Sequence, residues 1–95
     1  MPYIRQVDRK IFHDILHKIY VRISKIKDKQ ERAGILNYLI TSILMDCMAP
    51  RKYSEHALIF GILETVKHEI YRRRTIPYEE EKCRENGDIR WDWGS

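Results

Sequence analysis

The sequence predicts an all-α protein with three principal helices and a short C-terminal tail that is helical or turn-like. Apolar residues recur every three or four positions over three long stretches, proline interrupts the pattern after the second and third, and strand-like alternation is confined to a few residues near the C-terminus. The chain has 95 residues, 43% of them hydrophobic, and is expected to fold as one domain that buries about 65% of its surface. That domain spans residues 1–95, with a three-helix body at 1–75 and an acidic tail at 76–95.

The first helix is expected from Asp8 to about Ile26. Asp8 belongs to the residue types that favour the N-cap position. The apolar residues of this stretch share one stripe of a 3.6-residue helix, and they are Ile11, Phe12, Ile15, Leu16, Ile19, Ile23 and Ile26. A lysine-rich connector follows this stripe and leads into the next helix.

The second helix is expected from about Gln30 to Met48 and to be buried on two sides. One apolar face holds Leu36, Leu39, Ile40 and Ile43, and the apolar surface continues around the cylinder through Tyr38, Leu44, Met45 and Met48. Burial on two sides predicts that the chain assembles as a homo-oligomer, a dimer or a higher even state. Cys47 on this helix is expected to be a small core residue.

The third helix is expected from Ser54, as its N-cap, to about Arg74. Pro50 separates it from the second helix, and Pro77 is expected to end it and to change the direction of the chain. Its core stripe consists of Ile59, Ile62, Leu63, Val66 and Ile70.

The tail is expected to begin with a short helix from Pro77 to about Arg84, because proline suits the first helical turn. Asn86, Gly87 and Asp88 then predict a turn, since asparagine and glycine readily adopt a positive φ. Ile89, Trp91 and Trp93 alternate with polar residues, but this strand-like spacing is too short for an independent sheet.

The formal net charge is +4, and it is unevenly distributed. Residues 1–34 carry a balance of +5, residues 35–75 carry +2, and residues 76–95 carry −3. A basic body with an acidic tail weakens a simple nucleic-acid interpretation, because phosphate-backbone binders concentrate their positive charge on one face.

Catalytic and metal-binding patterns are missing from the sequence. His13 and His17 are four residues apart, but two ligands without a third of matching type do not make a zinc site. Cys83 has no identified activating base. We find no phosphate-cradling glycine loop and no nucleophile elbow. We therefore expect a non-enzymatic protein without cofactor or metal.

No membrane segment or secretory leader is expected. The most apolar stretch, Ile35 to Met48, is interrupted by four polar residues and is too short to span a bilayer. Two cysteines cannot supply a disulfide framework. We expect a cytoplasmic protein.

Two mixed helical faces suit a protein interface or a ligand cleft. The first combines Asn37 and Thr41 with Leu44 and Met48, and the second combines Phe60, Glu64, Lys67 and Tyr71. Apolar groups on such faces exclude water while a few polar groups orient a partner. Oligomer contact and a small-molecule site at such a contact both stay open.

Three consecutive arginines, Arg72, Arg73 and Arg74, are followed closely by Tyr78. Guanidinium groups match phosphate oxygens, and tyrosine offers a stacking surface for a base. The alternative is that arginines in a last helical turn favour the helix dipole and pair with Glu79, Glu80 and Glu81. The predicted ligand site consists of Arg72, Arg73, Arg74, Tyr78, Asn86 and Asp88, with Asn37, Thr41 and Lys67 added from a neighbouring helix or subunit.

Several segments resemble a family of small uncharacterised phage and prophage proteins. They are Met1–Ile4, Leu36–Thr41, Leu63–Lys67, Tyr71–Arg73, Pro77–Lys82 and Glu85–Ile89. The family more often has alanine and aspartate where this chain has Ile76 and Glu80. The resemblance implies no catalytic residue, and small phage proteins are often inhibitors, DNA-metabolism accessories or sequestrants of a host nucleotide signal. Our hypothesis is a sequestering protein for a nucleotide-like anion with a counter-defence role, and the alternatives are a DNA- or RNA-binding accessory or an inhibitor of a host protein.

Overall fold

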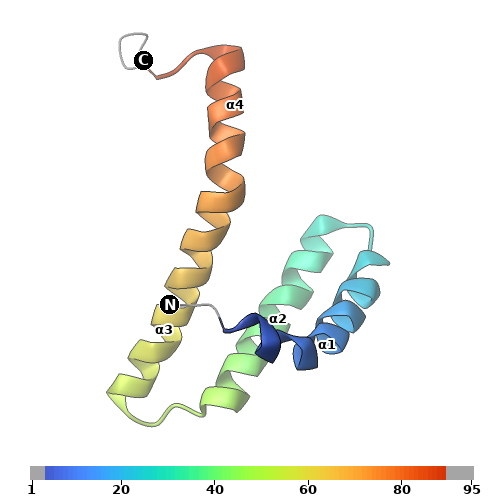
Figure 1. Ribbon diagram of the computed structural model, residues 1–95, viewed down its shortest axis with the longest axis vertical. Coiled ribbons are helices and arrows are strands. Elements are labelled where there is room, and N and C mark those ends of the chain that lie inside the picture. Colours follow the sequence, from blue (N-terminus) through green and yellow to red (C-terminus); the bar gives the residue numbers. More distant parts are fainter. Residues whose placement is uncertain (1–3, 90–95) are drawn as a thin grey trace. The chain divides into compact units, whose positions relative to one another are not determined.

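The computed structural model describes residues 4–89, of which 85% are helical and none lies in a strand. In chain order the elements are α1 (Gln6–Ser24), α2 (Lys29–Met48), α3 (Tyr53–Ile70), the π turn η1 (Tyr71–Thr75) and α4 (Ile76–Asn86) (Figure 1). The predicted all-α fold class is confirmed. The predicted alternation at Trp91 and Trp93 lies outside the described residues.

The chain divides into two units, Met1–Ile59 and Phe60–Ser95, with the division inside α3. The first unit contains α1, α2 and the beginning of α3. The second contains the rest of α3, η1 and α4. The single domain predicted for residues 1–95 stays a prediction.

In the first unit, α1 and α2 form an antiparallel helical hairpin (Figure 1). Arg32 of α2 joins the two helices, because its guanidinium donates hydrogen bonds to the carbonyl oxygens of Ile26 and, at 3.1 Å, of Ser24. A cation at the C-terminal end of a helix satisfies carbonyls that lack an intrahelical partner. Leu39 lies two helical turns beyond Arg32 on the same face and is half-buried. Arg32 and Leu39 therefore lie on a face of α2 that is partly covered.

The helix ends of the hairpin differ in detail from the prediction. Asp8 is not the N-cap of α1: the helix begins one turn earlier, with Arg5 at the cap position, and Asp8 forms an ion pair of 3.0 Å with Arg5. The side chain of Asp28, in contrast, caps α2 by accepting a hydrogen bond of 3.0 Å from the amide of Gln30. A carboxylate serves a helix N-terminus from either position, so residue type alone did not separate them.

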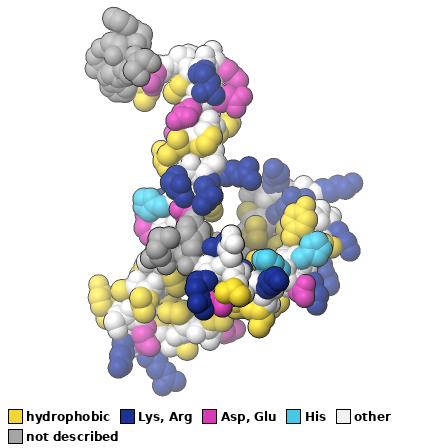
Figure 2. All heavy atoms as spheres, viewed as in Figure 1, with side chains coloured by type: hydrophobic (Ala, Val, Ile, Leu, Met, Phe, Trp, Pro, Cys, Tyr) yellow, Lys and Arg dark blue, Asp and Glu magenta, His cyan; other side chains and the backbone are white. Residues whose placement is uncertain are grey.

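None of the described residues is buried. Ile11 is 75% exposed and Ile43 is 51% exposed, and hydrophobic side chains appear across the visible surface beside lysine and arginine (Figure 2). Removing either unit can only raise the exposure of the other, so neither unit has a core of its own. The predicted burial of α2 on two sides, and of Cys47 as a core residue, is therefore wrong for the single chain.

Ala49 and Glu55 organise the connection from α2 to α3. Ala49 ends α2 in the left-handed conformation, with φ of 41°, and Pro50 follows it, so the predicted break is confirmed. Ser54 is not the N-cap of α3, because the first helical hydrogen bond runs from the amide of His56 to the carbonyl of Lys52. Glu55 reaches back and accepts hydrogen bonds of 2.9 Å from the amides of Arg51 and Lys52.

These two backbone hydrogen bonds favour the ionised form of Glu55 and lower its pKa from the ordinary value of 4.5. A carboxyl with a lowered pKa in the folded protein contributes stability that is present above its unfolded pKa. That contribution is lost as the pH falls below about 4.5 and through the folded value. The stability of the start of α3 therefore depends on pH through the carboxylate of Glu55.

We expect Glu55→Gln to lower the thermal unfolding midpoint at pH 7 and to change it much less at pH 3. The carboxylate accepts hydrogen bonds from two amides at neutral pH, whereas the wild-type side chain loses its charge as the pH falls through its lowered pKa. Circular dichroism melts of both proteins at the two pH values measure the difference. Glu80→Gln is the control, because Glu80 has no hydrogen-bond or ion-pair partner within residues 4–89. Equal losses at both pH values would contradict the assignment.

Candidate functional site

The π turn at Tyr71–Thr75 is the central feature of the second unit. The amide of Ile76 donates to the carbonyl of Tyr71, five residues back, where an α-helix would use four. Pro77 explains this widening, because its ring would clash with the carbonyl four residues earlier and its nitrogen has no hydrogen to donate. The helical ribbon therefore continues from α3 into α4 (Figure 1). The prediction that Pro77 ends the third helix is wrong, whereas its predicted place in the first turn of the next helix is confirmed.

Arg72 and Arg73 converge on one carboxylate, that of Glu69. The Nη2 atom of Arg72 lies 3.1 Å from Oε1 of Glu69, and Nε of Arg73 lies 2.9 Å from Oε2. Hydrogen bonding from Arg73 first, and from Arg72 next, lowers the pKa of Glu69 below its ordinary value. The alternative expectation, that these arginines pair with Glu79 to Glu81, is not what this structure shows.

Arg74 is exposed and has no hydrogen-bond or ion-pair partner within the described chain. Two tyrosines, Tyr71 and Tyr78, flank Arg74 in the sequence. The hydroxyl of Tyr71 donates to Glu79 at 3.4 Å, across the π turn. The ammonium of Lys82 lies 5.7 Å from the centre of the Tyr78 ring, a distance at which a cation is attracted to the ring face. Among the described residues, the π turn therefore carries one arginine, Arg74, without a hydrogen-bond or ion-pair partner.

The structure keeps Asn86 and Asp88 apart from the arginines. Asn86 is the last residue of α4 and Asp88 lies two residues beyond it, and the 11 residues of this helix correspond to about 16 Å at the usual helical rise. Gly87 has a φ of 85° and its amide caps α4 through the carbonyl of Cys83, so the positive φ expected of glycine here is confirmed, whereas Asn86 is helical and not part of a turn. Asp88 accepts a hydrogen bond from the amide of Ile89 at 2.7 Å. As ligand contacts, both residues stay predictions.

The remaining predicted site residues each have a local partner. Lys67 lies 3.6 Å from the carboxylate of Glu64 on α3. In the first unit, the hydroxyl of Thr41 donates to the side-chain oxygen of Asn37 at 3.3 Å. The expectation that Asn37, Thr41 and Lys67 join the arginines at a ligand stays a prediction.

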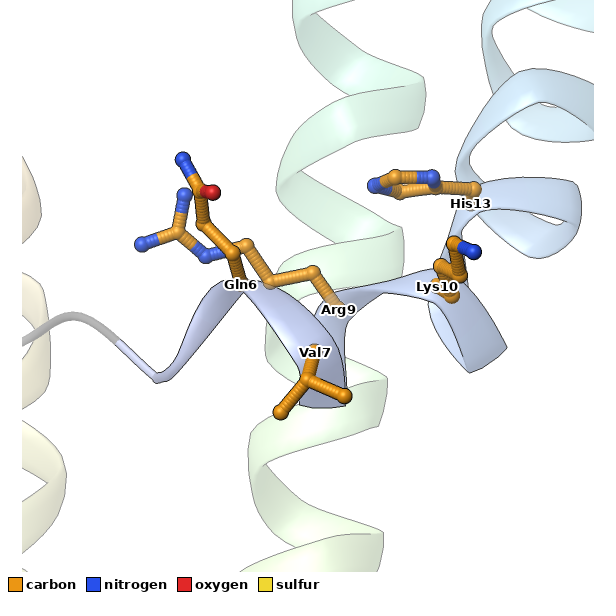
Figure 3. A pocket seen from close by; sticks show the side chains of 5 residues that line it. All are labelled: Gln6, Val7, Arg9, Lys10 and His13. Carbon is orange, nitrogen blue, oxygen red and sulfur yellow. The ribbon is translucent and has the colours of Figure 1, made fainter.

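A shallow, open depression lies on α1 and is lined by Gln6, Val7, Arg9, Lys10 and His13 (Figure 3). Gln6 and Arg9 extend at one end of it, and Lys10 and His13 lie at the other. The Nε of Arg9 donates to the carbonyl of Ile4 at 2.9 Å. Within residues 4–89 there is no group of three or more histidine, cysteine or acidic side chains that could hold a metal. Over the same range, no helix is long and apolar enough to span a membrane.

These features define a helical protein in which a basic π turn continues a long helix. The chain belongs to the family described as Domain of unknown function (DUF6899), whose family model matches residues 1–89. The predicted membership of an uncharacterised family is thereby confirmed over nearly the whole chain. No curated protein and no solved structure matches this chain.

Glu55 and Glu69 are two residues whose roles the sequence interpretation missed. Glu55 lies three positions after Lys52, the spacing at which a glutamate reaches back to a helix start. Glu69 lies three and four positions before Arg72 and Arg73, which is the spacing of neighbours on a helix surface. Both signals were present, but the helix start was assumed at Ser54, and the arginines were matched with the later glutamates Glu79 to Glu81.

We expect Pro77→Ala to remove the π turn and to raise the free energy of unfolding by about 1 kcal/mol or more, because proline is poorly tolerated within a helix. Circular dichroism melts measure the stability, and NMR backbone shifts over residues 71–75 report the turn. Pro50→Ala is the control, since Pro50 lies between helices and its loss restores no helical hydrogen bond. Retention of the π-turn shifts in Pro77→Ala would show that proline does not cause the turn.

Proposed function

We propose that this chain is a non-enzymatic binding protein that holds a nucleotide-like, phosphate-bearing anion at the π turn. The observation that carries the proposal is the exposed guanidinium of Arg74 beside the paired Arg72 and Arg73. Guanidinium groups bind phosphate oxygens through paired donors. The proposed site lies entirely in the second unit.

Positive charge at the π turn supports an anionic ligand. Arg72, Arg73 and Arg74 are consecutive, and the Glu69 carboxylate contacts the first two of these guanidinium groups. Tyr78 has Lys82 near its ring and is 59% exposed, which leaves ring surface for a base to stack on. Phosphate and base thus have candidate partners within about one turn of helix.

The biological setting of the proposal comes from the sequence. Resemblance to phage and prophage proteins supports cytoplasmic sequestration of a host nucleotide signal as the counter-defence role. A DNA- or RNA-binding accessory and an inhibitor of a host protein are the competing functions. The salt dependence of binding distinguishes a DNA- or RNA-binding accessory from a small-ligand site, because affinity for a phosphate backbone falls steeply with salt concentration.

We also propose that the chain works as a homo-oligomer. Val7, Ile11 and Ile15 recur every four residues on α1, and all three are more than half exposed. Contiguous exposed apolar surface is typical of sites of protein association. A second copy would cover this stripe through the same surface, as in a two-fold symmetric dimer.

Arg74→Ala is expected to weaken binding of inorganic pyrophosphate about tenfold, since a hydrogen bond to a charged group contributes roughly 1.5–3 kcal/mol. Isothermal titration calorimetry at 50 mM and 300 mM salt measures affinity and salt dependence. Arg84→Ala is the matched control, because it removes an exposed arginine of the same unit at the other end of α4. Equal losses of affinity in the two variants would exclude the π turn as the binding site.

We expect Ile11→Glu to dissociate the oligomer into 11.6 kDa chains, because an unpaired carboxylate is costly to bury. Light scattering at micromolar concentration gives the mass. His17→Glu introduces the same side chain into α1 away from the apolar stripe, and it is expected to leave the mass unchanged. A wild-type protein of 11.6 kDa under these conditions would reject the oligomer.

A further inference from the structure

Glu69 accepts hydrogen bonds from guanidinium N–H groups of Arg72 and Arg73, the donors that a ligand at the π turn would use. Arg72 donates to both carboxylate oxygens of Glu69, at 3.1 and 3.2 Å from Nη2. Arg73 donates from Nε to Oε2 at 2.9 Å. One carboxylate therefore gathers two guanidinium groups onto the same side of the helix, and it takes the place that an anionic ligand needs.

We infer that Glu69 is a resident competitor for the π-turn site, and that a doubly charged phosphoryl group binds by replacing the Glu69 carboxylate on Arg72 and Arg73. The inference rests on the proposed function and adds the class of ligand to it. Glu69 is a positioning residue here: it holds the arginines together in the free protein and releases them to the ligand.

Exposure makes the exchange feasible. The side chains of Arg72 and Arg73 are 61% and 60% exposed, whereas that of Glu69 is 26% exposed. Ion pairs between helical neighbours at a solvated surface contribute little to stability. Replacing one of them with another anion therefore costs little, and more than half of each arginine side chain is exposed to solvent.

Competition by Glu69 also favours a phosphate ligand over a carboxylate ligand. A carboxylate ligand has one negative charge and two oxygens, the same as Glu69, which is already in place. A terminal phosphate has up to two negative charges and three oxygens, so it can engage Arg72 and Arg73 together. Because both arginines lower the pKa of Glu69, the competing carboxylate remains charged at neutral pH.

The experiment compares pyrophosphate binding by wild type, Glu69→Gln and Asp8→Asn, using the full chain and isothermal titration calorimetry at neutral pH. Glutamine keeps the size of Glu69 and removes its charge, so affinity is expected to rise roughly three- to fivefold, as for the loss of a solvated ion pair. Asp8 is the matched control: it pairs with an arginine, Arg5, three positions away at 3.0 Å, and it lies in the first unit. Its variant is expected to bind as wild type does.

A second readout follows the carboxylate itself. In wild type, pyrophosphate should shift the NMR resonance of the Glu69 side-chain carboxyl carbon as the arginines leave it, and that of the Asp8 carboxyl carbon should stay in place. Circular dichroism confirms that the variants retain the helix content of wild type.

The outcomes separate this inference from the proposed function. Binding by wild type that Glu69→Gln leaves unchanged or weakens overturns the inference and leaves the proposed function standing. Binding only by Glu69→Gln overturns the proposed function for the natural chain and supports the competitor role. Failure of both proteins to bind overturns both.

Discussion

The missing amide hydrogen of Pro77 is the constraint on which the second unit depends. A proline at this position could have ended the helix, but the chain widens one turn and continues into α4. The widened turn comprises the arginine run itself, and Arg72 and Arg73 reach back to Glu69 while Arg74 has no partner among the described residues. The widened backbone and the three arginine side chains therefore lie within the same five residues, Tyr71–Thr75.

The first unit is organised at its helix ends rather than by a core. Arg32 binds the last carbonyls of α1, Asp28 caps α2, and Glu55 holds the backbone where α3 begins. Each of these contacts is local in sequence, and each supplies a partner that a helix end lacks. They specify where helices start and stop, but they cover none of the apolar stripe that includes Ile11. In this chain, the contacts that fix the helix ends are therefore not the contacts that would bury the apolar surface.

The helical elements could be predicted because their signals are local. Apolar spacing located the three long helices, Pro50 located the break, and Gly87 located the end of α4. Burial was mispredicted because spacing shows which residues share a face and does not show what covers that face. The candidate site was predicted only by residue type: the arginines were found, but they were matched with Glu79 to Glu81 instead of with Glu69. Asn86 and Asp88 were grouped with the arginines because a change of direction was assumed there.

The π turn also alters how this helix should be compared with others. A turn that takes in one extra residue has the geometry of a single-residue insertion into a continuous α-helix, and each residue of an α-helix accounts for a rotation of about 100°. Counting by heptads from Ile70 therefore assigns residues of α4 to the wrong side. A relative without proline at the position of Pro77 would present the same surfaces only if it were one residue shorter between α3 and α4. Alignments that penalise a gap at that point would superimpose faces that do not correspond.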